Sequence, residues 1–388
     1  MFLLGKMRSP LGLDISDLSI KLIQLAKDGD KIKIQALGKV DLPRGLLENG
    51  VIKDKKELAR AIHHLVIRPD FGRVTTDEAV ICLPENKTFL KIVELEKNDY
   101  DRKRTVENEL AKHVPLPADQ LYYDWQIIGD TGRADLIFIG AAERHLVDEQ
   151  VDLLKEAHLS ALAMESEPIS VCRCLMAEEN PRNKSTDKKN YAIIDIGATD
   201  ASVTIYSLNT ILFSVSIPLS GQEITDKIAA ALSIDEDQAE KVKILHGLDE
   251  KNNQPAVRKI ICEAVNDLTV RSREAIAYFN HHFPSWGPIE KILLCGGGAN
   301  VKDLDKIIQQ DTGIETAKGD VFVNLKENKG NLAKKFRKTF GLNTDVLEDG
   351  EETMKKNKES KTLKISHDTS LSFATAIGLA LRGIFIDE

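Results

Sequence analysis

Short apolar runs alternate with small polar turns along this chain, and two such stretches half a chain apart are nearly copies of each other. The first, Leu11–Lys21, reads Leu-Gly-Leu-Asp-Ile-Ser-Asp-Leu-Ser-Ile-Lys, and the second, Ile193–Val203, reads Ile-Ile-Asp-Ile-Gly-Ala-Thr-Asp-Ala-Ser-Val. In each, an apolar run ends in Asp-Ile and is followed by a tight polar turn and a second β-rich run, which is typical of a hairpin. The pairing predicts a duplicated domain.

The elements that follow the two copies also repeat. Near the N-terminus we expect strands at 19–26 and 31–42, then a helix that Asp54 caps and that runs to about residue 68. In the second half we expect strands at 191–196, 202–208 and 211–219, then a helix over 225–232. The same order twice predicts the same α/β unit twice.

The stretch between the two halves has no counterpart in the second half. Its pattern predicts a strand at 87–95, a helix at 100–114, a hairpin at 121–128 and 134–142, and a helix at 145–158. This indicates an α+β unit inserted into the first domain, which the chain rejoins at 162–175. The polar run 178–190 is interpreted as a linker between the halves.

The rest of the second half predicts a long helix, a buried strand and a glycine-rich turn. The helix covers 256–282, the strand 289–294 leads into Cys-Gly-Gly-Gly-Ala-Asn at 295–300, and a helix follows at 302–312. The charge-rich stretch 345–361 predicts a solvated loop, and a small-residue helix at 372–381 closes the chain. The predicted domains are therefore 1–85 with 164–190, the insert 86–163, 191–225 with 285–388, and a helical subdomain 226–284.

Composition narrows the class of protein. Of 388 residues, 42% are hydrophobic and 29% charged, the balance of a soluble globular chain with room for two domains. The net charge of -8 comes without a basic face, which argues against a nucleic-acid partner. Five scattered cysteines indicate reduced thiols, and no apolar run reaches the length of a membrane span or a signal-peptide core. We expect a cytoplasmic protein that reaches a membrane only through a partner.

The two matched aspartates are the first candidates for chemistry. Asp14 and Asp195 each end an apolar run beside a turn whose N–H groups face outward, an arrangement that holds phosphates and Mg²⁺ through metal-bound water. Either one alone also fits an aspartate that caps its own turn. Lys21 follows Asp14 by seven residues and is placed to reach the phosphates, or else it is a surface lysine on an edge strand.

Two further motifs are open to more than one interpretation. The glycine triplet 296–298 lets a flat ligand approach the backbone, although a plain turn has the same composition. Glu240 and Lys243 share one side of a helix that begins near Asp235, which also fits a solvated ion pair. The chain has no P-loop and no Gly-x-Ser-x-Gly turn, and its adjacent histidine pairs suit a metal poorly.

Together these residues resemble the actin-like ATPase superfamily and, within it, the PilM family of type IV pilus assembly, which is related to FtsA. The features shared with the PilM family are Lys112-His-Val-Pro-Leu-Pro-Ala-Asp, Glu165-Ser-Glu-Pro-Ile-Ser, Pro218-Leu-Ser-Gly-Gln-Glu-Ile-Thr and the closing Phe373-Ala-Thr-Ala-Ile-Gly-Leu-Ala-Leu-Arg. The resemblance runs from about residue 11 to residue 382. It implies duplicated ribonuclease-H-like, actin-like ATPase domains with an FtsA-type inserted subdomain.

The resemblance also implies a set of site residues around ATP and Mg²⁺. The metal would be held through water by Asp14 and Asp195. The nucleotide contacts would come from two phosphate loops, the Glu-x-x-Lys pattern beside the ribose and adenine, and the adenosine loop, namely Asp14, Ser16, Asp17, Ser19, Lys21; Asp195, Gly197, Ala198, Thr199; Glu240, Lys243; and Gly296, Gly297, Gly298, Asn300.

The function that the resemblance implies is an ATP-binding adaptor of a pilus assembly platform, with at most slow ATP turnover. Its partner would be the short cytoplasmic tail of a PilN-like inner-membrane protein, held in a groove beside the insert. The adaptor would lie at the inner membrane through this and other platform proteins, without inserting itself. Self-association stays open.

One departure and two alternatives accompany this interpretation. The first loop reads Ser16-Asp17-Leu18-Ser19 where the family usually has Gly-Ser-Ser-Ser, so the extra carboxylate and missing glycine predict weakened nucleotide binding, or a degenerate scaffold that binds none. An FtsA-like division filament would need a C-terminal amphipathic anchor, for which the chain leaves no room after 384–388. A sugar or acetate kinase would need a sugar-binding insert and a catalytic aspartate, and neither stands out.

Overall fold

The computed structural model describes residues 9–29, 31–97, 101–130, 132–177, 189–248, 255–325, 332 and 369–385. The predicted loop 345–361 and nearly all of the predicted linker 178–190 lie outside these residues. The five cysteines, all within the described part of the chain, are free thiols, as the composition predicted.

The first sheet begins with the predicted meander. Its strand order is β11-β7-β1-β2-β3-β6, in which β1 to β3 are antiparallel neighbours and β7 and β11 run parallel to β1. A small separate hairpin, β4 and β5, follows β3. The strands are β1 Leu11–Ser16, β2 Ser19–Asp28, β3 Lys31–Asp41, β4 Leu47–Glu48, β5 Val51–Ile52, β6 Phe71–Gly72, β7 Glu78–Leu83 and β11 Ser160–Ser166.

The second sheet repeats this topology. Its order is β14-β13-β12-β15-β16, again a three-stranded antiparallel meander followed by two parallel strands. The strands are β12 Tyr191–Ile196, β13 Ala201–Ser207, β14 Thr210–Ile217, β15 Lys291–Cys295 and β16 Glu315–Lys318. The predicted duplication of an α/β unit is therefore confirmed.

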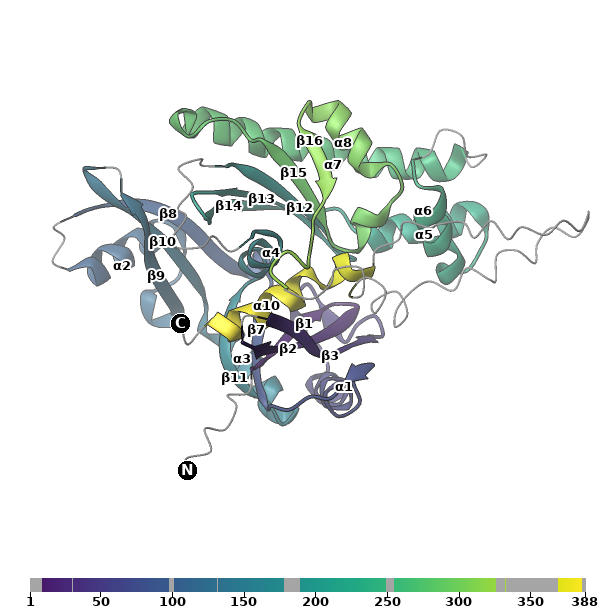
Figure 1. Cartoon of the computed structure of the whole chain (residues 1–388), viewed down its shortest axis with the longest axis horizontal. Helices are drawn as coiled ribbons and strands as arrows, with labels where there is room; N and C mark the ends of the chain where they lie inside the picture. The colour runs from purple at the N-terminus through teal and green to yellow at the C-terminus, as the bar shows by residue number, and fades with distance from the viewer. Residues whose placement is uncertain are drawn as a thin grey trace, which may run out of the picture.

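Helices cover both sheets and separate them (Figure 1). Helices α1 and α3 pack on one face of the first sheet, and α7 and α8 pack on the second sheet. The helices are α1 Lys55–Ile67, α2 Arg102–His113, α3 Arg144–Glu156, α4 Glu167–Leu175, α5 Gly221–Leu232, α6 Glu236–His246, α7 Pro255–His282, α8 Leu304–Thr312 and α10 Ala374–Phe385. Short 3-10 turns are η1 Glu85–Lys87, η2 Ala118–Gln120, η3 Pro284–Trp286, η4 Gly297–Asn300 and η6 Thr369–Phe373.

The inserted unit projects to one side of the molecule (Figure 1). It contains a three-stranded antiparallel sheet of order β8-β10-β9, formed by β8 Thr88–Glu96, β9 Leu121–Asp130 and β10 Ala134–Glu143. Its core joins β8 and β10 to α2 through Val93, Val106, Leu110 and Ile137. The predicted order of strand, helix and hairpin is confirmed. Helix α3, which the predicted bounds place in the insert, packs against α1 and β11 through the buried Leu153 and Leu154 and also contacts β9 and β10 of the insert.

Helices α4 and α10 lie between the two sheets (Figure 1). Helix α10 packs on β1, β2, β7 and α4, and glycines permit this close approach. A Cβ at Gly12 would lie 2.2 Å from the Ala376 carbonyl oxygen, and one at Gly378 would lie 1.8 Å from that of Ser170. The closing helix therefore packs on the first sheet, although the predicted domain bounds place it in the second unit; these bounds stay a prediction.

One predicted helix start was wrong. Helix α5 begins at Gly221, four residues before the expected start at 225, because Ser220 is its cap: Ser220 Oγ accepts the Glu223 N–H at 3.1 Å. A serine followed three residues later by glutamate is a capping box that the sequence interpretation missed. The cap of α1 was predicted correctly, since Asp54 Oδ1 accepts the Glu57 N–H at 3.0 Å.

Candidate functional site

A cleft of about 380 Å³ lies between the two sheets, where the β1–β2 and β12–β13 hairpins face each other. The predicted site residues that line it are Asp14, Ser16, Asp17, Ser19, Lys21, Asp195, Gly197, Ala198, Thr199, Glu240, Gly296, Gly297 and Asn300. Lys243 and Gly298 are not among its lining residues. The fold thus brings most of a set scattered over 287 positions of the sequence, from Asp14 to Asn300, into one cavity.

Asp14 and Lys21 form a buried ion pair at the base of the first hairpin. They face each other in the β1–β2 register, and Lys21 Nζ donates a 2.9 Å hydrogen bond to Asp14 Oδ2. Lys21 is only 9% exposed and β2 is an inner strand, so the interpretation as a surface lysine on an edge strand was wrong. Burial lowers the pKa of Lys21, but Asp14, Glu167 and Asp195 outweigh it and leave the pKa raised.

The Asp17 carboxylate is held by the neighbouring β4–β5 hairpin. Its two oxygens accept the backbone N–H groups of Asn49 at 2.7 Å and Gly50 at 3.2 Å, in the turn between β4 and β5. Hydrogen bonds from backbone amides stabilise the charged carboxylate. The repulsion that the sequence predicted for this loop is therefore partly offset by a structural contact.

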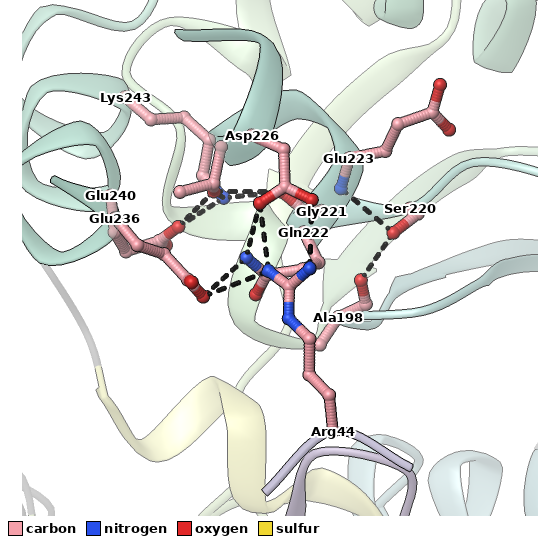
Figure 2. A network of polar contacts seen from close by, with 11 residues as sticks. Arg44, Ala198, Ser220, Gly221, Gln222, Glu223, Asp226, Glu236, Glu240 and Lys243 are labelled. Atoms are coloured by element: carbon pink, nitrogen blue, oxygen red, sulfur yellow. Dashed lines mark hydrogen bonds and ion pairs between the residues drawn. The ribbon is translucent and has the colours of Figure 1, made fainter. Parts of the chain in front are cut away.

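The second hairpin repeats the geometry of the first with a longer turn. Asp195 faces Ser202 in the register, at the position where Asp14 faces Lys21. The Gly197 N–H donates to the Asp200 carbonyl at 2.8 Å and closes the turn. The carbonyl of Ala198 accepts Ser220 Oγ and the Gln222 N–H, both at 2.9 Å, so the turn is fastened to the start of α5 (Figure 2).

Carboxylates dominate the electrostatics of the cleft. Burial, followed by the charges of Asp200 and Asp14, raises the pKa of Asp195 to about 7. Burial and the charges of Asp195 and Asp14 also raise the pKa of Glu167 well above its ordinary value. Lys21 lowers both values but does not cancel the effect. This excess of negative charge favours a divalent cation or bound protons.

The described residues contain no group of three or more His, Cys, Asp and Glu side chains arranged to bind a metal directly.

Three residues in the cleft were missed as candidates. Glu167 opens α4 and accepts a 3.3 Å hydrogen bond from Thr375 Oγ1; its signal was the Glu-Pro pair, because proline is favoured in the first turn of a helix. Glu85 reaches Ser202 and Ser214 of the second sheet, and burial is the main cause of its raised pKa. Lys39 lies next to Lys21 in the β2–β3 register and lines the cleft. Nothing in the sequence singled out Glu85 or Lys39, because both depend on pairing between distant segments.

The three glycines 296–298, in the loop that the resemblance assigns to adenosine, have different surroundings. Gly296 has φ +79°, and a Cβ there would lie 2.3 Å from Asp195 Oδ1. A Cβ at Gly298 would lie 2.3 Å from Ile196 Cγ2, so both positions need glycine for packing within the protein. A Cβ at Gly297 would meet nothing within 4 Å, and this residue is exposed. Gly297 therefore leaves space for a ligand.

Glu240 and Lys243 both lie on α6 but differ in environment (Figure 2). Lys243 is 5% exposed, and its Nζ donates to the Gly221 carbonyl at 2.9 Å and to Thr225 Oγ1 at 2.8 Å. It also pairs with Glu240 Oε2 at 2.5 Å, so the ion pair is present, but Lys243 is buried rather than solvated and fastens α6 to α5. Glu240 is partly exposed and lines the cleft.

A second and larger cavity, of about 960 Å³, lies between the insert, β11 and α4; we call it the groove. Five consecutive residues of β9, 122–126, and six of β11, 161–166, line it. Because successive side chains of a strand point to opposite faces, such runs indicate that the groove follows the edges of these strands. Among the described residues β9 and β11 are both edge strands.

The groove is mainly apolar with one charged cluster. Leu90, Phe138, Leu162, Met164 and Ile169 line it. Glu165 is 1% exposed at its side chain and pairs with two arginines that also line the groove, Arg173 and Arg382. Two guanidinium groups against one carboxylate leave one positive charge in excess at this end of the groove.

Comparison with known proteins gives the family. A family profile described as type IV pilus assembly protein PilM matches residues 12–338. The chain belongs to the PilM family. The resemblance to this family that the sequence motifs indicated is thereby confirmed.

Solved structures agree on the fold. The PilM-family chain is similar to a chain of a PilM-PilN type IV pilus biogenesis complex, with TM-score 0.73 and 20% identity over 97% of this chain and 98% of the other. It also resembles MreB5 of Spiroplasma citri, bound to ADP in one structure and to AMPPNP in another, each with TM-score 0.51 and 15% identity. The alignments cover 89% and 86% of this chain, and 100% and 97% of MreB5. The actin-like ATPase fold is therefore confirmed. No helix among the described residues is long and apolar enough to cross a membrane.

Proposed function

We propose that this PilM-family chain is a nucleotide-binding adaptor of a type IV pilus assembly platform or a related system. It binds ATP with Mg²⁺ in the cleft and holds the cytoplasmic tail of a PilN-like inner-membrane protein in the groove. Helix α4 carries the proposal, because one short element contributes to both cavities. Its first residue, Glu167, lines the cleft, while Ile169, Cys172 and Arg173 line the groove.

The cleft suits a magnesium nucleotide. Asp14 and Asp195 would hold the hydrated ion from the two hairpins, which fits the preference of Mg²⁺ for carboxylates and retained water. Lys21 supplies a positive charge beside the phosphates, and backbone N–H groups of the two turns supply donors. Bound Mg²⁺ would offset the negative charges of both the phosphates and the carboxylates. Gly297 leaves room for the adenosine, and Glu240 also lines the cleft.

Asp17 argues against a degenerate cleft. The lost glycine and the added carboxylate were the reasons to expect weak binding, yet the carboxylate is engaged by the Asn49 and Gly50 amides. Slow ATP turnover is consistent with the site. Glu167 lies on the helix between the two domains, burial raises its pKa well above the ordinary value, and it is our candidate for orienting a water molecule. We therefore propose a binding protein with weak ATPase activity at most.

The groove suits a short extended peptide. Open strand edges accept an added strand through backbone hydrogen bonds, and apolar pockets then select alternate side chains. Asp124 Oδ1 accepts the Trp125 N–H at 2.8 Å, so a side chain now covers part of the β9 edge and would give way to a peptide. The similar chain of the PilM-PilN complex supports a PilN-like tail as this peptide. Through that tail the adaptor would lie at the cytoplasmic face of the inner membrane, next to other platform proteins.

Calorimetric titration with the N-terminal peptide of the same organism's PilN-like protein tests the adaptor function. The groove variant Leu162→Asp places a charge at a 42% exposed apolar position of β11. Its matched control, Ile67→Asp, makes the same kind of change at a 58% exposed position of α1, away from both cavities. We expect binding by the unaltered chain and by Ile67→Asp, and at least about a tenfold loss for Leu162→Asp. Absence of peptide binding by the folded, unaltered chain would overturn the adaptor proposal.

A further inference from the structure

The segment 42–52, between β3 and α1, is tied to the first phosphate turn. The Leu42 N–H donates to the Leu18 carbonyl at 2.8 Å, and Asp17 receives the amides of Asn49 and Gly50. Asn49 and Gly50 have φ of +51° and +73°, so this Asn-Gly pair forms the turn of the β4–β5 hairpin with both N–H groups turned toward Asp17. The segment is therefore anchored to the Asp17–Leu18 turn at both ends.

Arg44 extends from this segment to the other half of the molecule (Figure 2). Its Nη2 and Nη1 donate to Asp226 Oδ1 and Oδ2 at 2.8 Å and 3.2 Å, a two-pronged contact that fixes the orientation of both groups. Nη2 also pairs with Glu236 Oε1 at 3.2 Å. Asp226 lies on α5 and Glu236 on α6, so one arginine of the first half binds two helices of the second.

Those two helices are in turn joined to the second phosphate turn. Gln222 links Asp226 to Glu236 through its side-chain amide, at 3.1 Å and 2.6 Å. The backbone N–H of the same residue holds the Ala198 carbonyl, together with Ser220 Oγ. Hydrogen bonds at both ends and the backbone of segment 42–52 between them therefore connect Asp17, through Arg44, Asp226 and Gln222, to Ala198.

We propose that segment 42–52 is a strap, with Asp17 as its anchor and Arg44 as its fastener, that holds the two phosphate turns together and slows release of bound nucleotide. The inference rests on the proposed nucleotide site and adds its regulation. The side chains of Arg44, Asp226 and Glu236 are 53%, 45% and 56% exposed, so solvent and salt weaken their contacts. The fastener is therefore reversible, which a release step requires. Asp17, the departure from the family's usual loop, serves as the strap's anchor.

Release of a fluorescent ATP analogue with Mg²⁺, followed by stopped-flow fluorescence, tests the strap. We expect Arg44→Ala to release the analogue about three- to tenfold faster than the unaltered chain, because one exposed, multiply bonded arginine is lost. The control Arg60→Ala removes a 77% exposed arginine that pairs with Glu57 on α1, and should leave release unchanged. The double variant Arg44→Glu/Asp226→Arg exchanges the charges of the pair, and the new arginine at position 226 can still pair with Glu236. We expect this variant to restore slow release.

Hydrogen–deuterium exchange without nucleotide separates failure of the strap from failure of the nucleotide site. We expect Arg44→Ala, but not Arg60→Ala, to speed exchange in segment 42–52. If the unaltered chain binds no nucleotide, the proposed function fails, and exchange alone then decides whether the strap exists. Unchanged release and unchanged exchange in a folded Arg44→Ala variant would overturn the strap, as would equal acceleration by Arg60→Ala.

Discussion

Lys21 and Asp14 lie opposite each other on β2 and β1, joined by a 2.9 Å hydrogen bond with both side chains almost fully enclosed. The same register position in the second hairpin pairs Asp195 with Ser202, which carries no charge. The duplicated fold therefore has a neutralised aspartate on one side of the cleft and an aspartate without a facing cation on the other. This asymmetry concentrates the unbalanced negative charge near Asp195.

Removing the ammonium from the buried pair should destabilise the protein strongly. In Lys21→Met, Asp14 stays buried without its partner, and we expect a loss of about 3–5 kcal/mol in the free energy of unfolding. Urea unfolding at neutral pH measures it. The control Lys39→Met changes the neighbouring, 34% exposed lysine, for which we expect a loss below about 1 kcal/mol. Similar losses for the two variants would contradict the assigned burial of the Asp14–Lys21 pair.

Asp195 should make the empty protein less stable as the pH rises. Its pKa is raised from 3.8 to about 7, chiefly by burial and by Asp200 and Asp14, with Lys21 opposing. A carboxyl group whose pKa rises on folding contributes stability below its unfolded value and loses it as the pH passes the folded value. We therefore expect the melting temperature without ligand to fall between about pH 4 and pH 7. Asp195→Asn should flatten this dependence.

The same titration should act on ligand binding in the opposite direction. Mg²⁺ requires the ionised carboxylate, so affinity for the magnesium nucleotide should rise as the pH increases through about 7. Titration calorimetry at several pH values measures this. A constant affinity across that range would show that Asp195 does not take part.

Alanine substitutions should separate Gly296 from Gly297, in the loop that we propose binds adenosine. Gly296→Ala combines a positive φ with a clash against Asp195, and we expect it to lower the free energy of unfolding by about 2 kcal/mol or more. Gly297→Ala meets open space, so stability should change by less than about 1 kcal/mol while nucleotide affinity falls. Thermal unfolding and calorimetry on both variants check the pair. Loss of folding in Gly297→Ala would contradict its assignment to the ligand side.

Glu167 should oppose folding of the empty protein at high pH. Glu167→Gln removes a buried charge beside Asp195 and Asp14 but keeps an oxygen to accept the Thr375 hydrogen bond. We expect the empty protein to gain roughly 1 kcal/mol of stability at pH 8, the scale of one pKa unit. Any ATP turnover should fall more than nucleotide affinity does. Loss of stability together with unchanged ATP turnover in Glu167→Gln would contradict the role that we assign to Glu167 in the site.

Local sequence patterns predicted much of the architecture, and the residues show why. The Asp-Ile turns at Asp14 and Asp195 gave the duplicated hairpins, because apolar periodicity and turn chemistry are local properties. The start of α5 was missed although its Ser220 capping box is local. Contacts between segments far apart in the sequence were beyond prediction. Asp17 with Asn49 and the burial of Lys243 depend on packing within one half, and Arg44 with Asp226 depends on how the two halves meet.

Titration calorimetry with ATP and Mg²⁺, on the unaltered chain and on Asp195→Ala, tests the central claim that the two hairpins hold a magnesium nucleotide between them. Asp152→Ala, at an exposed position of α3, is the matched control. We predict binding that requires Mg²⁺, its loss in Asp195→Ala, and no change in Asp152→Ala. Binding of equal affinity by Asp195→Ala, or no binding by the folded, unaltered chain, would contradict the account.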